Sequence, residues 1–457
     1  MESYELIVIG SGPGGEKAAL FAADHGHSVC VIDHGPAGGA WVNTGTIPSK
    51  TLRESALYLA GGRRHGVVST SSNNPTVRSF MSLKRHLVAR WRERIEHDFK
   101  NSAVTRICAT ARFIDAHTLG LSTGEKVHGE RILIATGSSP RSVPELPVDG
   151  NLVHNSDTLL SLNHIPASMI VLGGGVIACE YASIFQALGV QVTLINGRDR
   201  VLGFVDNEMS DFIEDAFRES GMVVRNDARP EALQTYKGEG VEVYLDDGTM
   251  DSAEVVFVAL GRKPATDELN LEAAGVSLTH WGTIEVNEYM QTEVEHIYAA
   301  GDVVGFPSLA SMGMEQGREA AAHMFGVKRG AIDALIPNGV FTIPELSSVG
   351  FTTEEAIKHG FDPVCATASY DKAVRSHMLG ENAGMINLVV DRSSHCLLGA
   401  CIIGSHATEL IHIAMTIIRY GGTVDDLDRF VFNVPTLSVL YKIAAQDVLK
   451  QLEPQEG

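Results

Sequence analysis

The chain has 457 residues, enough for about three domains of ordinary size. Its formal net charge is −20, from 56 acidic and 36 basic residues, and this excludes non-specific nucleic-acid binding, which needs a basic surface. Apolar residues make up 44% of the chain, but no apolar stretch reaches the roughly 18 residues that span a bilayer, so we expect no membrane partner.

The first predicted element is a strand, turn, helix and second strand over residues 4–33. Its turn reads Gly10-Ser11-Gly12-Pro13-Gly14-Gly15 and is called the first fingerprint below. Glycines let backbone N–H groups approach a pyrophosphate, and the start of the helix favours its negative charge. Asp33, 18 positions after Gly15, lies near the offset at which a carboxylate binds a ribose. We therefore predict a dinucleotide site with the candidate residues Gly10, Gly12, Gly14, Gly15 and Asp33.

Three further elements are expected between residues 36 and 137. A glycine-rich loop and a polar helix start occupy residues 36–56, and apolar residues recur at helical spacing from Phe80 to Phe99. Residues 131–137 read as a buried strand that ends in a tight turn, Ala135-Thr136-Gly137. The outer face of the expected helix is basic, which favours a solvated face over a binding patch; its cations are Lys84, Arg85, Arg90, Arg92 and Arg94.

A second unit of strand, glycines, helix and strand covers residues 168–196. Its turn, the second fingerprint, reads Gly173-Gly174-Gly175-Val176-Ile177-Ala178, with alanine where a third glycine would allow close helix packing. The second strand ends at Asn196, where a carboxylate would bind the 2′-hydroxyl of NAD and repel the 2′-phosphate of NADP. Asparagine is neutral, and Arg198 and Arg200 can meet a phosphate. This pattern predicts a site that admits both NAD(H) and NADP(H); an ordinary surface loop is the alternative.

The remaining elements complete an internal repeat and add a different module. Residues 255–262 echo the strand 131–137, so the fingerprint and the later strand both occur twice, as expected for two similar nucleotide domains. Residues 297–302 form another strand that ends at Asp302. From about 337 to 457, alternating stretches and an apolar helix at 407–420 predict a mixed module suited to dimerisation. We expect an α/β fold with two Rossmann-like three-layer dinucleotide-binding domains and a C-terminal α+β dimerisation domain.

The cysteines and histidines indicate neither a disulfide framework nor a metal site. The six cysteines are scattered without a Cys-x-x-Cys pattern, and the chain enters a strand within four residues without a leader pattern, so we expect a cytoplasmic protein with buried thiols. Cys396 and Cys401 lie on opposite faces of one expected strand, which favours structural thiols over a redox pair. The 18 histidines form no cluster with ligand spacing, so no metal is expected.

Together these motifs resemble the flavoprotein pyridine nucleotide-disulfide oxidoreductases, the family of glutathione reductase and dihydrolipoamide dehydrogenase. The likeness covers nearly the whole chain and rests on both fingerprints and on five other segments. Those segments are residues 39–50, Ala135-Thr136-Gly137, Gly261-Arg262-Lys263-Pro264, Ala300-Gly301-Asp302 and Pro435-Thr436-Leu437-Ser438.

The resemblance implies an FAD site at the first fingerprint and a nicotinamide site at the second. It implies an FAD-binding domain over 1–147 and 268–336, an NAD(P)-binding domain over 148–267 and a dimerisation domain over 337–457. Lys50, paired with Glu180, would lie near flavin N5 as the catalytic pair, and Asp302 would contact the flavin ribityl chain. The full set of implied cofactor contacts adds Gly39, Thr46, Lys50, Ala135, Thr136, Gly137, Gly173, Gly175, Glu180, Asn196, Arg198, Arg200, Gly261, Gly301 and Asp302 to those of the first fingerprint.

Two departures from the family pattern bear on the reaction. Trp41 and Thr46 stand where the family has two cysteines five apart, and neither can exchange thiol for disulfide. Val434 and Val439 stand where the family has a histidine and a glutamate that handle protons, and valine is neither acid nor base. The elements that reduce a disulfide are therefore replaced, whereas the flavin and nicotinamide elements remain.

Threonine at position 46 resembles the soluble, Si-specific pyridine nucleotide transhydrogenase branch of the family. Residues 43–54, 194–200 and 432–436 are similar to that branch, while Trp41, Val434 and Val439 replace its usual Cys, Tyr and Glu. The resemblance implies hydride transfer between NADPH and NAD⁺ through FAD in a ping-pong cycle, by a homodimer or larger homo-oligomer.

Three other functions stay open. The same motifs would serve an NAD(P)H diaphorase that reduces quinones, metals or oxygen. A degenerate nucleotide-binding module is motivated by Trp41 and the two valines, although the charged pair Lys50 and Glu180 argues against it. A disulfide reductase that uses Cys396 and Cys401 is disfavoured, because those residues lie outside residues 39–50, the flavin loop in which the family has its two cysteines.

Overall fold

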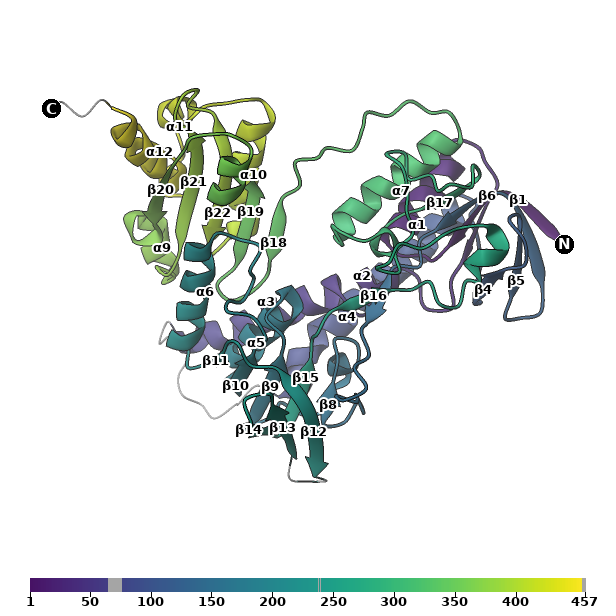
Figure 1. Cartoon of the computed structure of the whole chain (residues 1–457), viewed down its shortest axis with the longest axis horizontal. Helices are drawn as coiled ribbons and strands as arrows, with labels where there is room; N and C mark the ends of the chain where they lie inside the picture. Colours follow the sequence, from purple (N-terminus) through teal and green to yellow (C-terminus); the bar gives the residue numbers. More distant parts are fainter. Residues whose placement is uncertain (65–75, 237, 239, 454–457) are drawn as a thin grey trace.

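The computed structural model describes residues 1–64, 76–236, 238 and 240–453, arranged in three lobes (Figure 1). The lobe at the right of Figure 1 contains the N-terminus, the lower lobe contains the second fingerprint, and the lobe at the upper left contains the C-terminal segment. In the described part of the chain, no helix is both long enough and apolar enough to cross a membrane.

The first lobe is built on a parallel sheet that is buried on both sides. Its strands run in the order β3-β2-β1-β6, and β17 also pairs with β6. The antiparallel strands β4 and β5 extend this sheet, and helices α1 and α7 pack against each other on it (Figure 1). The elements are β1 (Glu2–Ile9), α1 (Pro13–Asp24), β2 (Val29–Ile32), β3 (Thr105–Ile107), β4 (Ala111–Phe113), β5 (Thr118–Leu121), β6 (Lys126–Ile134), β17 (Ile297–Ala299) and α7 (Ala310–Met324). Because both faces of such a sheet are covered, β2 and the C-terminal ends of β1 and β6 are apolar runs.

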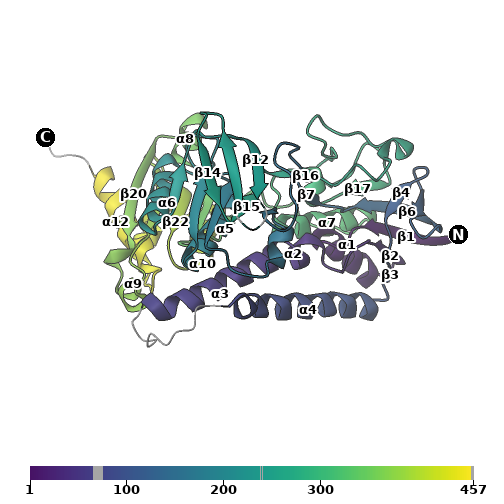
Figure 2. The same cartoon turned by 90° about the horizontal axis from the view of Figure 1, so that it is seen from below.

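Three helices lie between β2 and β3 in the chain: α2 (Gly39–Asn43), α3 (Thr46–Arg64) and α4 (Val77–Asn101). Figure 2 shows α3 and α4 side by side along one edge of the molecule. The helix predicted from Phe80 to Phe99 is confirmed as the central part of α4, and both of those side chains are buried.

The second lobe repeats the same architecture. Its five-stranded parallel sheet has the order β11-β10-β9-β15-β8, with a separate antiparallel sheet β12-β13-β14. The elements are β8 (Val153–His154), β9 (Ser168–Leu172), α5 (Val176–Ala187), β10 (Gln191–Ile195), α6 (Asn207–Glu219), β11 (Val223–Arg225), β12 (Pro230–Tyr236), β13 (Gly240–Leu245), β14 (Met250–Ala253) and β15 (Val255–Val258). Strands β7 (Ser138–Pro140) and β16 (Arg262–Pro264) pair where the chain passes between the two lobes (Figure 2).

The third lobe is an antiparallel sheet with helices. The strand order is β18-β19-β22-β21-β20, and α10 and α12 pack on the sheet. Its elements are β18 (Asn338–Val340), β19 (Leu346–Gly350), α8 (Thr353–Lys358), β20 (Pro363–Ser369), α9 (Val374–Leu379), β21 (Met385–Asp391), β22 (Leu397–Ile403), α10 (Ala407–Arg419), α11 (Val424–Arg429) and α12 (Val439–Leu452). The predicted fold class, two Rossmann-like units followed by an α+β module, is confirmed.

The cysteines differ from the expectation in one respect. All six are free thiols, and Cys30, Cys179 and Cys401 are buried as expected. Cys108, which follows the short edge strand β3, is exposed, and Cys365 and Cys396 are only half-buried. The expectation of buried thiols was therefore wrong for Cys108, because that part of the sheet edge lies open to solvent. The strand expected to hold both Cys396 and Cys401 begins only at Leu397, so Cys396 lies before it and is partly accessible.

Candidate functional site

The first fingerprint folds as a tight turn between β1 and α1. A β-carbon at residue 15 would lie 1.9 Å from the Gly10 carbonyl oxygen, and one at residue 10 would lie 2.3 Å from the Ala135 carbonyl oxygen. These two glycines therefore allow the turn to pack against its own backbone and against the end of β6. By contrast, a β-carbon at Gly12 would meet nothing nearer than the Gly39 α-carbon at 4.0 Å, so this side of the turn is open.

The start of α1 can bind an anion. Gly12 is the N-cap and offers no side-chain hydrogen bond to the first turn, and Pro13 opens the helix. The N–H groups of Gly14 and Gly15 therefore have no partner inside the helix. Backbone donors that converge at a helix start are suited to a pyrophosphate.

Asp33, at the end of β2, braces this turn. Its Oδ2 accepts hydrogen bonds from the Ser11 backbone N–H (2.7 Å) and the Ser11 hydroxyl (2.6 Å), and its Oδ1 accepts one from the Gly35 N–H (2.8 Å). The structure thus brings Asp33 to the fingerprint, as its sequence offset indicated. The contact with a ribose stays a prediction.

The ends of the neighbouring strands β6 and β17 bring Thr136, Gly137, Gly301 and Asp302 together. The Thr136 hydroxyl is buried and has no hydrogen-bond partner among the described residues. A β-carbon at Gly137 or Gly301 would meet nothing within 4 Å. Asp302 Oδ2 accepts a hydrogen bond from the Ser138 hydroxyl at 2.6 Å. A polar ligand with its own hydrogen-bonding groups would complete this arrangement, which is consistent with a dinucleotide along the first fingerprint.

A buried ion pair joins all three lobes. Lys50 Nζ, on α3, donates to Glu180 Oε1 (2.7 Å) and Oε2 (2.6 Å) on α5. The Phe341 N–H, just after β18, donates to Glu180 Oε1 at 2.9 Å, and the Phe341 ring lies under Lys50 Nζ, 4.9 Å from its centre. The Glu180 side chain is only 4% exposed, so these three hydrogen bonds from two donor groups compensate for its burial. The sequence argument missed Phe341, because its contact with Glu180 is made by the backbone.

The flavin loop contains no thiol in the structure. Trp41 lies in α2 and packs edge-on against Trp91 of α4, with ring centres 5.3 Å apart. Thr46 is exposed at the start of α3. Val434 is 76% exposed, and Val439 begins α12. The chain therefore has no group for thiol exchange or proton transfer at these four positions.

The second fingerprint has the same geometry as the first. A β-carbon at Gly173 would lie 2.6 Å from the Ala259 carbonyl oxygen, at the end of β15, so this glycine allows close backbone packing. Gly175 is the N-cap of α5, and a β-carbon there would meet nothing within 4 Å. Gly261, just before β16, also leaves open space. The open side of Gly175 and the unpartnered N–H groups of α5 are suited to bind a second anion.

Asn196 is fixed by a buried network that the sequence did not reveal. Its Nδ2 donates to the Arg198 carbonyl oxygen (3.1 Å) and to Asn226 Oδ1 (2.9 Å). Asn226 in turn donates to both carboxylate oxygens of Glu214, at 2.9 and 3.0 Å. The amide of Asn226 therefore sets the orientation of Asn196, whose Oδ1 faces the Arg198 N–H at 3.3 Å and Gly174.

The two predicted arginines lie in different environments. Arg198 is exposed and forms no ion pair among the described residues. Arg200 forms an ion pair with Asp211, and its Nε lies 3.7 Å from Asp199. The hydrogen bond to Asp211 raises the pKa of Arg200. Arg198 is thus available to a ligand, whereas the charge of Arg200 is compensated.

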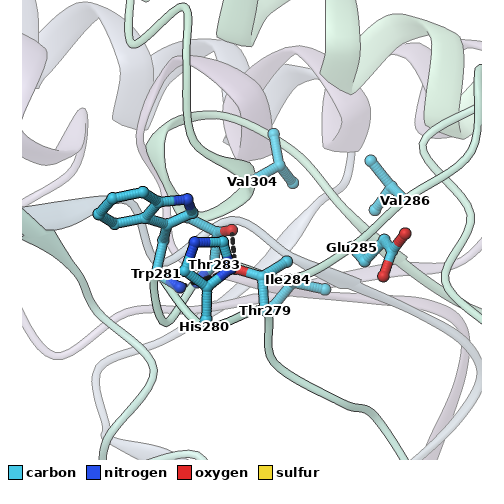
Figure 3. Close-up of a pocket in the computed structure, with 8 residues that line it drawn as sticks. All are labelled: Thr279, His280, Trp281, Thr283, Ile284, Glu285, Val286 and Val304. Carbon is cyan, nitrogen blue, oxygen red and sulfur yellow. Dashed lines mark hydrogen bonds between the residues drawn. The ribbon is translucent and has the colours of Figure 1, made fainter.

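Two surface cavities lie apart from the fingerprints. The first, about 480 Å³, lies beside the turn that contains His280, Trp281 and Glu285 (Figure 3). None of the predicted site residues lines it. The second, about 390 Å³, lies between the flavin loop and α4 and is lined by Lys84, Arg85 and Arg92. Lys84 is half-buried and donates to the Leu160 carbonyl oxygen (2.7 Å), and burial lowers its pKa. Arg85, Arg90 and Arg94 are exposed, as expected for a solvated face, so Lys84 departs from that expectation most clearly.

The comparisons with known proteins agree with the geometry of these sites. The model of the pyridine nucleotide-disulphide oxidoreductase family matches residues 4–317, and the model of that family's dimerisation domain matches residues 336–445. The soluble pyridine nucleotide transhydrogenase of Mycobacterium tuberculosis is 39% identical over 99% of this chain and 98% of its own length. That of Vibrio vulnificus is 36% identical over 98% of both chains.

Solved structures show the same architecture at lower identity. LpdA from Mycobacterium tuberculosis superposes with a TM-score of 0.89 at 27% identity, over 98% of this chain and 100% of that one. The HOCl-induced flavoprotein disulfide reductase RclA from Escherichia coli gives 0.89 at 26% identity, over 97% of this chain and 99% of that one. This chain therefore belongs to the pyridine nucleotide-disulphide oxidoreductase family, and within that family to the soluble pyridine nucleotide transhydrogenases.

Proposed function

We propose that this oxidoreductase transfers hydride between NADPH and NAD⁺ in a ping-pong cycle, with FAD at the first fingerprint. The observation that carries the proposal is that the chain keeps the charged pair expected near the flavin but lacks the residues that reduce a disulfide. The buried pair Lys50–Glu180 is intact, whereas Trp41 and Thr46 replace the thiols and Val434 replaces a proton-handling residue. Curated relatives of nearly the same length are named soluble pyridine nucleotide transhydrogenase.

The residues of the first lobe fit FAD. The N–H groups at the start of α1 would bind its pyrophosphate, Asp33 its ribose and Asp302 its ribityl chain. The unpartnered Thr136 hydroxyl and the open space at Gly137 lie along the same strand ends. When bound, FAD supplies a centre that accepts hydride from one nicotinamide and returns it to another. On this basis we assign residues 1–147 and 268–336 to FAD, 148–267 to NAD(P), and 337–457 to dimerisation.

Lys50 and Glu180 would supply the electrostatics of the reaction. Two hydrogen bonds from Nζ hold the ammonium group against a carboxylate that is itself fixed by the Phe341 N–H. A fixed cation favours negative charge on a neighbouring ring and needs no reorganisation during the reaction. Hydride exchange between two nicotinamides requires no separate acid or base, so valine at positions 434 and 439 is compatible with it.

One nicotinamide site would serve both dinucleotides in turn. The open side of Gly175 at the start of α5 would receive the pyrophosphate. Asn196 carries no charge, so it can accept a hydrogen bond from a 2′-hydroxyl without repelling a 2′-phosphate. Arg198 is exposed at the same edge and can pair with that phosphate.

We also propose a cytoplasmic homodimer, or a larger homo-oligomer, assembled through the third lobe. Residues of this lobe expose large apolar side chains, including Tyr420 at 84% and Val431 at 98%. The match to the family's dimerisation domain covers the same segment. A second copy would remove this apolar surface from water.

The decisive experiment is anaerobic turnover of the FAD-loaded protein with NADPH and a spectrally distinct NAD⁺ analogue. Lipoamide, oxidised glutathione and a quinone are run in parallel. We expect rapid reduction of the analogue and no turnover of either disulfide. Flavin that NADPH reduces but only the quinone reoxidises would replace the proposal with a diaphorase. No flavin reduction at all would indicate a nucleotide-binding module.

A further inference from the structure

Two loops that are distant in sequence lie against each other at the end of the second sheet. Strands β10 and β11 are parallel neighbours, and the segments that follow them continue side by side. The Asp227 N–H donates to the Arg198 carbonyl oxygen (2.9 Å), and the Ala228 N–H donates to the Asn196 carbonyl oxygen (3.1 Å). This backbone ladder brings Arg229 next to the residues that face the dinucleotide ribose.

The side chain of Arg229 crosses over Gly197. A β-carbon at residue 197 would lie 3.1 Å from Arg229 Cγ and 3.7 Å from its Nε. The first of these distances is tight, so glycine at position 197 gives the arginine room to lie there. The backbone of Arg229 is fixed on its other side, because its N–H donates to Asp246 Oδ1 (2.9 Å) and its carbonyl oxygen accepts from the Asp246 N–H (2.9 Å).

The charge at this edge is not compensated equally. In the part of the chain that the structure describes, the guanidinium groups of Arg198 and Arg229 form no ion pair with a carboxylate within 4.0 Å, and both residues are exposed. Arg200 is bound to Asp211 instead. Two arginines without an ion-pair partner among the described residues therefore lie on either side of Gly197. Gly197 directly follows Asn196, the position at which a side chain distinguishes the 2′-hydroxyl of NAD from the 2′-phosphate of NADP.

We infer that Arg229 determines specificity for NADP(H) by binding the 2′-phosphate together with Arg198 across Gly197. The inference rests on the proposed function of this site as a nicotinamide dinucleotide site. A guanidinium group can donate two parallel hydrogen bonds to a phosphate, and two such groups would share a dianion. NAD(H) carries a hydroxyl at that position and gains nothing from either cation. Asn196 tolerates both dinucleotides, while the arginine pair provides the affinity that the 2′-phosphate needs.

The test measures by calorimetry how tightly the FAD-loaded protein binds two half-ligands, which are the adenosine ends of the two dinucleotides. Adenosine 2′,5′-bisphosphate carries the 2′-phosphate, and 5′-AMP lacks it. For Arg229→Gln we expect binding of the bisphosphate to weaken about tenfold, about 1.4 kcal/mol, with 5′-AMP changed less than twofold. The loss should shrink at high salt, because exposed charges are screened. Arg392→Gln, which removes an equal charge from the third lobe, is the matched control, and Arg200→Gln should cost less than Arg229→Gln.

A second variant keeps the inference testable if Arg229→Gln does not fold. Gly197→Ala leaves every arginine in place but fills the space under Arg229, so it should reduce the preference for the bisphosphate in the same direction. Equal weakening of both half-ligands by Arg229→Gln, no change in either, or a larger loss with Arg200→Gln would each overturn the inference. A wild-type protein that prefers the bisphosphate but reduces no NAD⁺ analogue would leave the inference standing and refute the proposed function. A wild-type protein without that preference would refute the inference whatever its turnover.

Discussion

Replacing Asn196 by aspartate tests how this site admits both dinucleotides. Aspartate has the shape of asparagine, so the change adds a charge and no volume. A longer glutamate would fit less well, because the Asn196 side chain already fills the space where a β-carbon on residue 174 would lie, 2.4 Å from its Cγ. Asn196→Asp therefore adds a charge at this position without changing the volume of the side chain.

The substitution has a cost inside the protein that the structure defines. Asn196 Nδ2 donates two hydrogen bonds, to the Arg198 carbonyl oxygen and to Asn226 Oδ1. A carboxylate oxygen cannot donate, and rotation of the Asn226 amide would turn its own oxygen toward Glu214. Each lost buried hydrogen bond costs about 1–3 kcal/mol. We expect the free energy of unfolding to fall by about 2–4 kcal/mol, which chemical denaturation measures.

The effect on ligands follows from Coulomb's law. Two unit charges about 4 Å apart near a protein surface interact by about 4 kcal/mol. Solvent and the exposed Arg198 screen part of this repulsion, so we expect the Kd for NADPH to rise by at least about 30-fold, about 2 kcal/mol. The Kd for NADH should stay the same or fall, because a carboxylate accepts a hydrogen bond from the 2′-hydroxyl more strongly than an amide does.

The assay is anaerobic titration of each nucleotide into the FAD-loaded variant, followed by steady-state KM values. Asn196→Ala is the control, since it removes the side chain without adding charge and should not reproduce the selective loss of NADPH affinity. If Asn196→Asp weakened NADPH and NADH to the same extent, the argument that neutrality at this position permits dual use would be refuted.

Three further predictions use the same geometry. Glu180→Gln leaves the ammonium group of Lys50 without its carboxylate. Because Lys50 is 26% exposed, we expect a loss of about 1–3 kcal/mol in the free energy of unfolding. Flavin reduction by NADPH should be slower in stopped flow, and an unchanged rate would remove this pair from the mechanism. In Gly175→Ala the new β-carbon would have no protein atom within 4 Å, so the fold should persist. Titrations should show weaker binding of both NADH and NADPH, and weaker binding of only one of them would contradict a shared pyrophosphate site. Hydrogen bonds from Ser393 and Ser394 lower the pKa of Asp391 from 3.8 to about 2. The stability that this carboxylate contributes is therefore complete above about pH 4 and is lost as the pH falls toward about 2. Asp391→Asn should flatten the pH dependence of urea unfolding over that window, and an unchanged slope would exclude this role.

The nucleotide units could be predicted from the sequence because their determinants are local. Residue 15 has to be glycine, because a β-carbon there would lie 1.9 Å from the Gly10 carbonyl oxygen, and it stands at a fixed sequence distance from the strand before it and the helix after it. The replacements at Trp41, Thr46, Val434 and Val439 are equally plain in the sequence, because the chemistry they remove depends on side-chain type alone. The roles of the individual cofactor-binding residues stay predictions.

Tertiary structure decided which of these groups meet and which charges remain free. The Phe341 N–H donates to Glu180 from 161 positions further along the chain. No sequence pattern predicts this contact, because the donor is a backbone group. Arg200 and Arg229 look alike in the sequence, yet the first is held by Asp211 and the second lies over Gly197. The sequence by itself determined the two dinucleotide units and the absence of a redox disulfide, since those depend on local backbone space and side-chain chemistry. The packing of β10 against β11 decided the charge presented to a 2′-phosphate, because an ion pair depends on distances between residues that only the folded chain brings together.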